Sequence, residues 1–115
     1  MCDSHPGYSS SQLAAHLAQQ QQCQQRTVQH HHAHLLAVMA EHGVTSPADG
    51  VAWDGSGWGD DGTVWGGEAI TVQPNGYRRR ARLRPFALVG GETAARQPRR
   101  IALALLVEAY GQQWR

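Results

Sequence analysis

The sequence predicts a mixed α/β fold that contains two helices, a short β-sheet and a further helix near residue 110. Three observations support this class. Residues 9–42 hold two segments in which apolar residues recur with helical spacing. A glycine-rich stretch follows, in which alternating apolar and polar residues indicate strands. Residues 98–110 again have helical spacing and end at Gly111, a residue type that commonly follows a helix.

The first two predicted helices differ in their apolar content. Residues 9–25 form the first helix, whose glutamine-rich end is expected to be solvated. Residues 26–29 are a connector or a short strand. The second helix covers residues 30–42 and stops at Gly43. Because this second helix is apolar on almost every side, we expect it to be buried between layers.

A β-hairpin and a basic strand are expected in the middle of the chain. Residues 50–54 form a short strand, the segment GSGWGDDG forms a turn, and residues 63–72 form the returning strand. Gly66–Gly67 indicates a bulge in the returning strand. A Pro-Asn-Gly turn then leads to a basic strand over residues 78–84, whose charges are expected to protect a sheet edge.

The last predicted helix begins at Pro98, since proline favours the first helical position, and a loop precedes it. Residues at helical spacing on this helix are expected to face the core: Leu103, Leu106, Val107 and Tyr110. Three aromatic residues are expected in the core or the wall around the hairpin: Trp53, Trp58 and Trp65.

Composition limits the class of partner. The chain has 115 residues, enough for one domain at most, and a net charge of +1, which gives no global field toward nucleic acid or membranes. Cys2 and Cys23 are too few for a disulfide framework and are expected as free thiols in a reducing cytosol. The run IALALLV is far shorter than the ~18 residues that span a bilayer. We therefore expect a cytoplasmic chain without nucleic-acid or membrane partners.

Four histidines open the second helix, and two of them are spaced to share a metal ion. His30 and His34 are four residues apart, so they project from one helix face. Asp54, between a strand and a glycine-rich turn, is the best carboxylate candidate, and the three residues would leave an open coordination position. The competing interpretations are a coincidental histidine pair and a routine Asp-Gly turn. His31 and His32 point away from this helix face.

The glycine-rich turn permits a second interpretation. Its backbone amides could approach a phosphate closely, because glycine has no side chain. Hairpin turns use the same residues, so this signal is weak by itself. Asp60, Asp61 and Gly62 are expected at the exposed tip of the turn.

Several long motifs resemble one known family. The segment VQHHHAHLLAVMAEHG followed by VAWDGSGWGDDGTVWGGE resembles the HypF carbamoyltransferases of nickel–iron hydrogenase maturation. CDSHPGYSSSQLA and ARLRPFALVGGETAARQPRRIALALL resemble further motifs of that family, in the same order. The departures are Ser4, Val89, Glu92 and a glutamine run at residues 19–25, and none of them touches the histidine pattern.

The resemblance implies a partial actin-like ATPase fold of the ASKHA type and a metal site. The family's ligands fall on His30, His34 and Asp54, which would hold iron or zinc, while a further aspartate ligand is expected beyond Arg115. No catalytic residue is assigned. Weaker assignments to the substrate or nucleotide side fall on His31, His32, Gly55, Gly57, Gly59 and Glu68.

The resemblance also implies a reaction. The family uses carbamoyl phosphate and ATP to form carbamoyl-adenylate, and transfers the carbamoyl group to the C-terminal cysteine of its partner HypE for cyanide-ligand synthesis. Residues 1–115 are expected to be a fragment of the transferase domain, without the acylphosphatase-like, zinc-finger and YrdC-like domains, and to be inactive alone. The alternatives are an O-carbamoyltransferase of the antibiotic or nodulation type and a non-catalytic metal-binding remnant.

Overall fold

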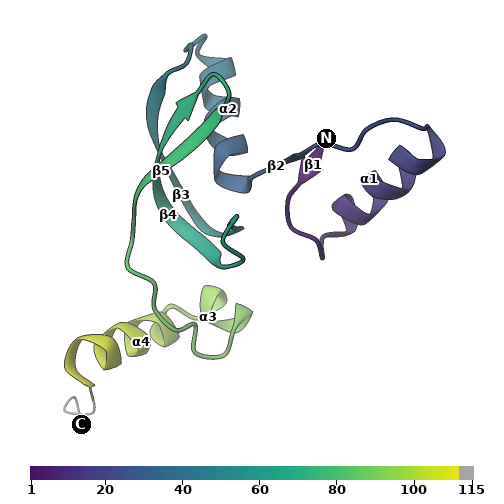
Figure 1. Ribbon diagram of the computed structural model, residues 1–115. Helices are drawn as coiled ribbons and strands as arrows, with labels where there is room; N and C mark the ends of the chain where they lie inside the picture. The colour runs from purple at the N-terminus through teal and green to yellow at the C-terminus, as the bar shows by residue number, and fades with distance from the viewer. Residues whose placement is uncertain (112–115) are drawn as a thin grey trace. The chain divides into compact units, whose positions relative to one another are not determined.

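The mixed α/β class is confirmed, and the chain divides into two compact units. The computed structural model describes residues 1–111, apart from the side chain of Glu92. Residues 1–83 form the first unit, and the second unit begins at Arg84. The first unit holds two helices and two small sheets, and the second holds two helices (Figure 1). None of the described helices has the length and apolar character that crossing a membrane requires.

The first small sheet is a parallel pair formed by the start of the chain and the connector between the first two helices. Strand β1 (Cys2–Asp3) pairs with β2 (Thr27–Val28), which confirms a short strand in this connector. Helix α1 (Ser9–Gln20) lies between them in sequence. It ends earlier than predicted, and Gln22 has a left-handed φ of 48°, which a continuing helix does not allow.

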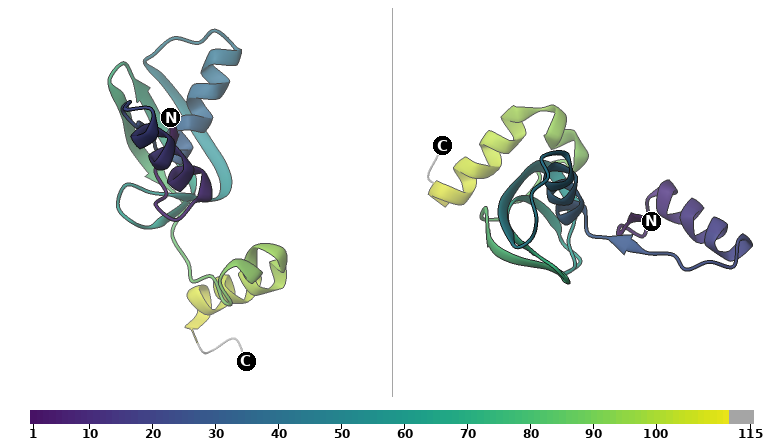
Figure 2. Two further views of the ribbon diagram at one scale, coloured as in Figure 1. Left: turned by 90° about the vertical axis from the view of Figure 1, so that its right-hand side faces the viewer. Right: turned by 90° about the horizontal axis from the view of Figure 1, so that it is seen from above.

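Helix α2 (His30–Glu41) has nearly the predicted limits but not the predicted burial. Leu35 packs with Ile70 and Val72 of the neighbouring sheet in a small core. Leu36 and Val38 are exposed, so the expectation of burial on all sides is wrong for the described chain. The reason is that a single sheet covers the helix on one side. Figure 2 shows this sheet curling around α2.

That sheet is an antiparallel meander of β3 (Ala48–Trp58), β4 (Val64–Gln73) and β5 (Gly76–Arg82), in that order. The predicted hairpin turn before Gly76 and the basic strand at the sheet edge are confirmed. β3 is longer than predicted because the glycine-rich segment continues the strand almost to its tip.

The sheet contains an irregularity close to the predicted bulge, but on the other strand. Trp53 lies opposite Gly67, and Gly57 lies opposite Trp65. Residues 54–56 of β3 therefore face the single residue Gly66 of β4. The bulge expected at Gly66–Gly67 is corrected: the extra residues belong to β3. Such a bulge bends a strand and redirects its side chains.

The tryptophans follow the alternation of the strands. Trp65 is buried and Trp58 is half-buried, as expected, whereas Trp53 is 75% exposed. The neighbouring Ala52 is buried, and successive strand residues point to opposite faces. The expectation that Trp53 belongs to the core or its wall is therefore wrong in the described structure.

The second unit contains α3 (Glu92–Arg96), which was expected to be loop, and α4 (Pro98–Tyr110), which has the predicted limits. The buried residues described in this unit are Ala94 and Ala104, one on each helix. Small residues thus take the buried positions. The apolar face expected in the core is largely exposed among the described residues, because its members Leu106, Val107 and Tyr110 are exposed and Leu103 is half-buried.

Candidate metal centre

The N-terminal turns of α2 and the bulge of β3 bring the three predicted ligands together. His30 Nε2 lies 3.1 Å from His34 Nε2 and 3.0 Å from Asp54 Oδ2. His34 Nε2 lies 3.8 Å from the same carboxylate oxygen. Helical spacing places the two imidazoles on one face, and the bulge turns Asp54 toward them. The cluster is half-buried on the His30 side and open on the side of His34, whose side chain is 56% exposed.

The spacing of these atoms fits a single metal ion. The three distances place the atoms on a circle with a radius of about 2 Å, close to the zinc–nitrogen and zinc–oxygen distances of about 2.0–2.2 Å. Two imidazoles and one carboxylate also suit iron or zinc and leave coordination positions for a substrate. The donor set therefore fits the metal that the sequence predicted.

A fourth residue, Asp3 of β1, orients His30. Its Oδ2 accepts a hydrogen bond from His30 Nδ1 at 2.7 Å, and its Oδ1 accepts one from the backbone N–H of His5 at 2.8 Å. In neutral His30 the hydrogen is then on Nδ1, and a lone pair on Nε2 faces Asp54 Oδ2. Two lone pairs at 3.0 Å repel each other, whereas a cation between them would be ligated by both.

The contact with His30 also affects the pKa of Asp3. Partial burial raises its pKa, but the hydrogen bonds from His30 and from the His5 backbone outweigh that effect, so the pKa lies below its ordinary value. Asp3 is a site residue that the sequence does not predict. No local sequence pattern predicts this role, because Asp3 is placed beside the start of α2 by the parallel pairing of β1 with β2.

Asp54 is half-buried, with a side chain that is 22% exposed, but both of its carboxylate oxygens are buried and lack hydrogen bonds in the described chain. Among the described residues, neither of its oxygens has a hydrogen-bond partner that satisfies both distance and angle. His31 Nε2 lies 2.7 Å from Oδ1, and it too has no hydrogen bond among the described residues. Buried polar atoms without partners are costly. An unbonded carboxylate that faces three imidazoles is therefore further support for a bound cation.

The glycines assigned to the substrate side lie in different environments. A Cβ on Gly57 would come within 2.6 Å of the rings of His30 and His31, and one on Gly59 would overlap the indole of Trp65. These two glycines allow side chains to pack against the strand. Gly55 is exposed and has open space around it, so of the three it is the one whose backbone a ligand can approach.

Of the other assigned residues, Glu68 and His32 make their contacts with residues outside the ligand set, whereas His31 contacts Asp54. Glu68 is buried and accepts two hydrogen bonds from Arg79, at 2.6 and 2.9 Å, which gives it a structural role in the sheet. His32 stacks obliquely against Tyr77. Burial lowers the pKa of His32, and the charge of Asp60 partly offsets that effect. His31 is fully buried and contacts the carboxylate of Asp54 directly.

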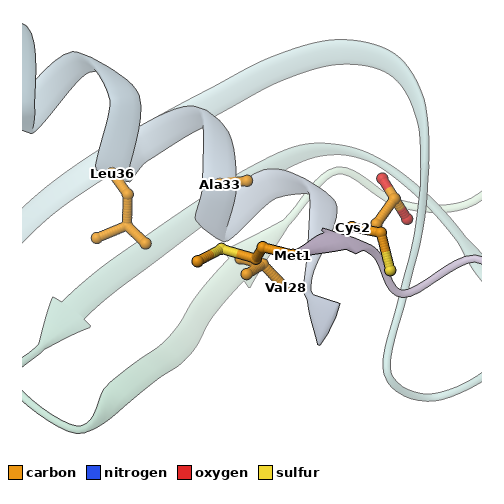
Figure 3. Close-up of a pocket in the computed structure, with 6 residues that line it drawn as sticks. Met1, Cys2, Val28, Ala33 and Leu36 are labelled. Atoms are coloured by element: carbon orange, nitrogen blue, oxygen red, sulfur yellow. The ribbon is translucent and has the colours of Figure 1, made fainter. Parts of the chain in front are cut away.

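A cavity of about 350 Å³ lies beside the centre, between β1, β2 and α2 (Figure 3). Its lining is mostly apolar, and Asp3 is the residue that it shares with the histidine cluster. An apolar wall does not hold a phosphate. The remaining lining residues are Met1, Cys2, Val28, Ala33 and Leu36.

The chain is similar to proteins of one known family. Residues 50–115 match the family described as "Carbamoyltransferase, Kae1-like Domain, second subdomain", and residues 1–41 match the "HypF Kae1-like domain". Over 112 residues the chain is 48% identical to a carbamoyltransferase HypF of Synechocystis sp., covering 96% of this chain and 14% of that relative. A probable carbamoyltransferase HypF of Methanocaldococcus jannaschii is 32% identical over 98% of this chain and 15% of its own length.

A solved structure is also similar. It is described as the crystal structure of full-length HypF in the phosphate- and nucleotide-bound form. The match has a TM-score of 0.81 and 39% sequence identity, and it covers 92% of this chain and 14% of that one. The chain thus spans about 14% of the length of such relatives. With matches to both family descriptions, the chain belongs to the HypF carbamoyltransferase family.

Proposed function

We propose that this chain forms part of the transferase centre of a HypF enzyme and holds one divalent ion, iron or zinc, through His30, His34 and Asp54. The observation that carries the proposal is the buried Asp54 carboxylate, which faces both imidazoles without a hydrogen-bond partner in the described chain. Membership in the carbamoyltransferase family supplies the class of reaction.

The reaction is transfer of a carbamoyl group from carbamoyl-adenylate, made from carbamoyl phosphate and ATP, to the C-terminal cysteine of HypE. The cysteine thiolate attacks the carbamoyl carbon, a carbon–sulfur bond forms, and the adenylate phosphate leaves with the electrons of the broken carbon–oxygen bond. When bound, the ion supplies Lewis-acid polarisation of the carbamoyl oxygen.

The residues of this chain prepare the site for that substrate. Asp3 holds the Nδ1–H of His30, so that Nε2 is directed to the centre. A phosphate can approach the exposed backbone at Gly55 closely. Gly55 is two residues before Gly57, against which the rings of two histidines pack. The similar solved protein binds phosphate and nucleotide, which supports the same ligand classes here.

Metal binding is tested on the 115-residue chain by titration with zinc and with ferrous iron. We expect His30→Ala and His34→Ala to abolish tight binding, since each removes a ligand. His16→Ala on α1 is the matched control, because His16 is exposed and far from the cluster in sequence. Unchanged affinity in both ligand variants would show that the cluster is an ion-pair network and not a metal site.

Transfer is tested in a chimera, because the chain alone spans a small part of its relatives. The matching segment of the Synechocystis relative is replaced by residues of this chain, and HypE is analysed by mass spectrometry after incubation with carbamoyl phosphate and ATP. We expect a carbamoyl adduct on the terminal cysteine from the chimera, and none from its His30→Ala form or from the 115-residue chain alone. Transfer to a sugar hydroxyl in place of the cysteine would indicate an O-carbamoyltransferase instead.

A further inference from the structure

A chain of hydrogen bonds with a fixed direction leads from the N-cap of α2 toward Asp54. Gln29, which is 5% exposed, caps the helix: its Oε1 accepts from the backbone N–H of His32 at 2.9 Å. A backbone N–H can only donate, so this contact identifies the amide oxygen of Gln29. The amide nitrogen Nε2 then carries two hydrogens, and one of them is donated to the carbonyl of Trp58 at 3.0 Å.

The second amide hydrogen fixes the proton on His31. Gln29 Nε2 lies 3.1 Å from His31 Nδ1, which must therefore accept. Neutral His31 then carries its own hydrogen on Nε2, the atom that lies 2.7 Å from Asp54 Oδ1. His31 is fully buried, so its ring has little freedom to turn. The 2.7 Å separation is within the range of a hydrogen bond from Nε2–H to the carboxylate.

We infer that Gln29 is a positioning residue for the centre: it sets the tautomer of His31, which in turn engages Oδ1 of Asp54 and leaves Oδ2 for the metal. Oδ2 is the oxygen that lies 3.0 Å from His30 Nε2 and 3.8 Å from His34 Nε2. Capping alone does not explain this residue, because the favoured N-cap residues are Asn, Asp, Ser, Thr and Gly. Gln has a longer side chain with an amide donor, and here its Nε2 lies 3.1 Å from His31 Nδ1.

The inference rests on the proposed metal centre, but its first test needs no metal. Long-range ¹H–¹⁵N NMR of the 115-residue chain distinguishes a protonated from an unprotonated imidazole nitrogen at His31. We expect Nε2–H in the parent chain. In Gln29→Glu the carboxylate keeps the cap but can only accept, so a proton should appear on Nδ1. In Gln29→Ser the cap is kept and the donor is lost, so both tautomers should be populated. Gln19→Glu on exposed α1 adds the same charge and should change nothing.

Zinc titration of the same variants gives the second measurement. We expect the affinity to fall about 10-fold in Gln29→Glu and Gln29→Ser, as is typical when a residue that orients a ligand is changed. A proton on Nδ1 of His31 in the parent, an averaged signal, or a tautomer that is unchanged in both Gln29 variants would overturn the inference. A parent chain with the expected tautomer but no zinc binding would instead overturn the proposed metal centre and leave the link from Gln29 to His31 standing.

Discussion

Asp54 and Asp61 each precede a glycine in the same glycine-rich segment, yet their carboxylates differ in their hydrogen bonds. Asp61 accepts hydrogen bonds from Thr63 and from the indole of Trp65, and it lies 3.3 Å from Arg79. The hydrogen bond from Thr63 is the main cause that lowers the pKa of Asp61 to about 2. Asp54 has no such partners among the described residues and faces three imidazoles.

The difference shows how a binding carboxylate is distinguished from a structural one. The carboxylate of Asp61 is satisfied by its own loop, within four residues in sequence, apart from Arg79. The oxygens of Asp54 are withheld from the loop because the bulge turns the side chain toward α2. A carboxylate with buried oxygens that its own loop leaves without hydrogen bonds can bind a ligand, whereas the hydrogen bonds of Asp61 are already used in the turn.

The largest effect is expected from the matched pair Asp54→Asn and Asp61→Asn. Both changes are isosteric and remove one negative charge. Zinc affinity should fall by more than about 100-fold in Asp54→Asn, since losing a ligand exceeds the 10–100-fold effect of losing a residue that orients one. Asp61→Asn should bind zinc like the parent. Isothermal titration calorimetry measures both, and equal losses in the two variants would remove the distinction between these aspartates.

A second pair of substitutions tests the packing that holds the histidines near Asp54. An added methyl at Gly57 meets the rings of His30 and His31, whereas one at Gly55 meets open space. Gly57→Ala should lower zinc affinity about 10-fold, through ligand displacement. It should also destabilise the fold by about 1–3 kcal/mol, because of overpacking.

Gly55→Ala is the control for this pair and should leave both properties near parental values. Zinc titration and urea unfolding followed by tryptophan fluorescence measure the two effects. A Gly57→Ala chain that is as stable as the parent and binds zinc equally well would contradict the packing described here.

Asp3 is intermediate between the two aspartates, because both of its oxygens are bonded and one of them holds a ligand residue. The two donors contact different oxygens of Asp3, and in Asn one of these oxygens is replaced by an NH2 group, which cannot accept from His5 or His30. Asp3→Asn should therefore lower zinc affinity about 10-fold. Asp49→Asn, an equivalent change at an exposed residue paired with Thr71, should have no effect. If NMR shows that His30 keeps its Nδ1–H in Asp3→Asn and zinc binding is unchanged, Asp3 does not orient the ligand.

The smallest effect concerns the titration of Asp61. Its folded pKa of about 2 is below the unfolded value of about 3.9, so its stabilising contribution is complete above the unfolded pKa and is lost as the pH falls through the folded one. Carboxyl-carbon NMR should show a midpoint of about 2 for Asp61. Thr63→Val, which removes the hydroxyl donor, should move this midpoint upward. An Asp61 midpoint near the unfolded value in the parent chain would show that the loop does not hold the carboxylate.

Features of the fold that depend on local sequence were predicted well. The start of α4 at Pro98 and the turn before Gly76 were both found as predicted, because proline and glycine constrain their own backbone. The shared face of His30 and His34 followed from the helical period alone, and the structure places their Nε2 atoms 3.1 Å apart. Burial was predicted less well, since the exposure of Trp53 and Val38 depends on which faces the sheet and helix cover.

The sequence by itself determined which residues are able to ligate a metal and that two of them share a helix face. The tertiary structure decided the rest. The bulge, whose position depends on the pairing of β3 with β4, turns the side chain of Asp54 toward the histidines of α2. The parallel pairing of β1 with β2 places Asp3 beside His30. The tertiary fold also places the carbonyl of Trp58 beside the side-chain amide of Gln29. These contacts join residues that are 27 and 29 positions apart, and no local pattern encodes them, because strand pairing and register are fixed by tertiary packing.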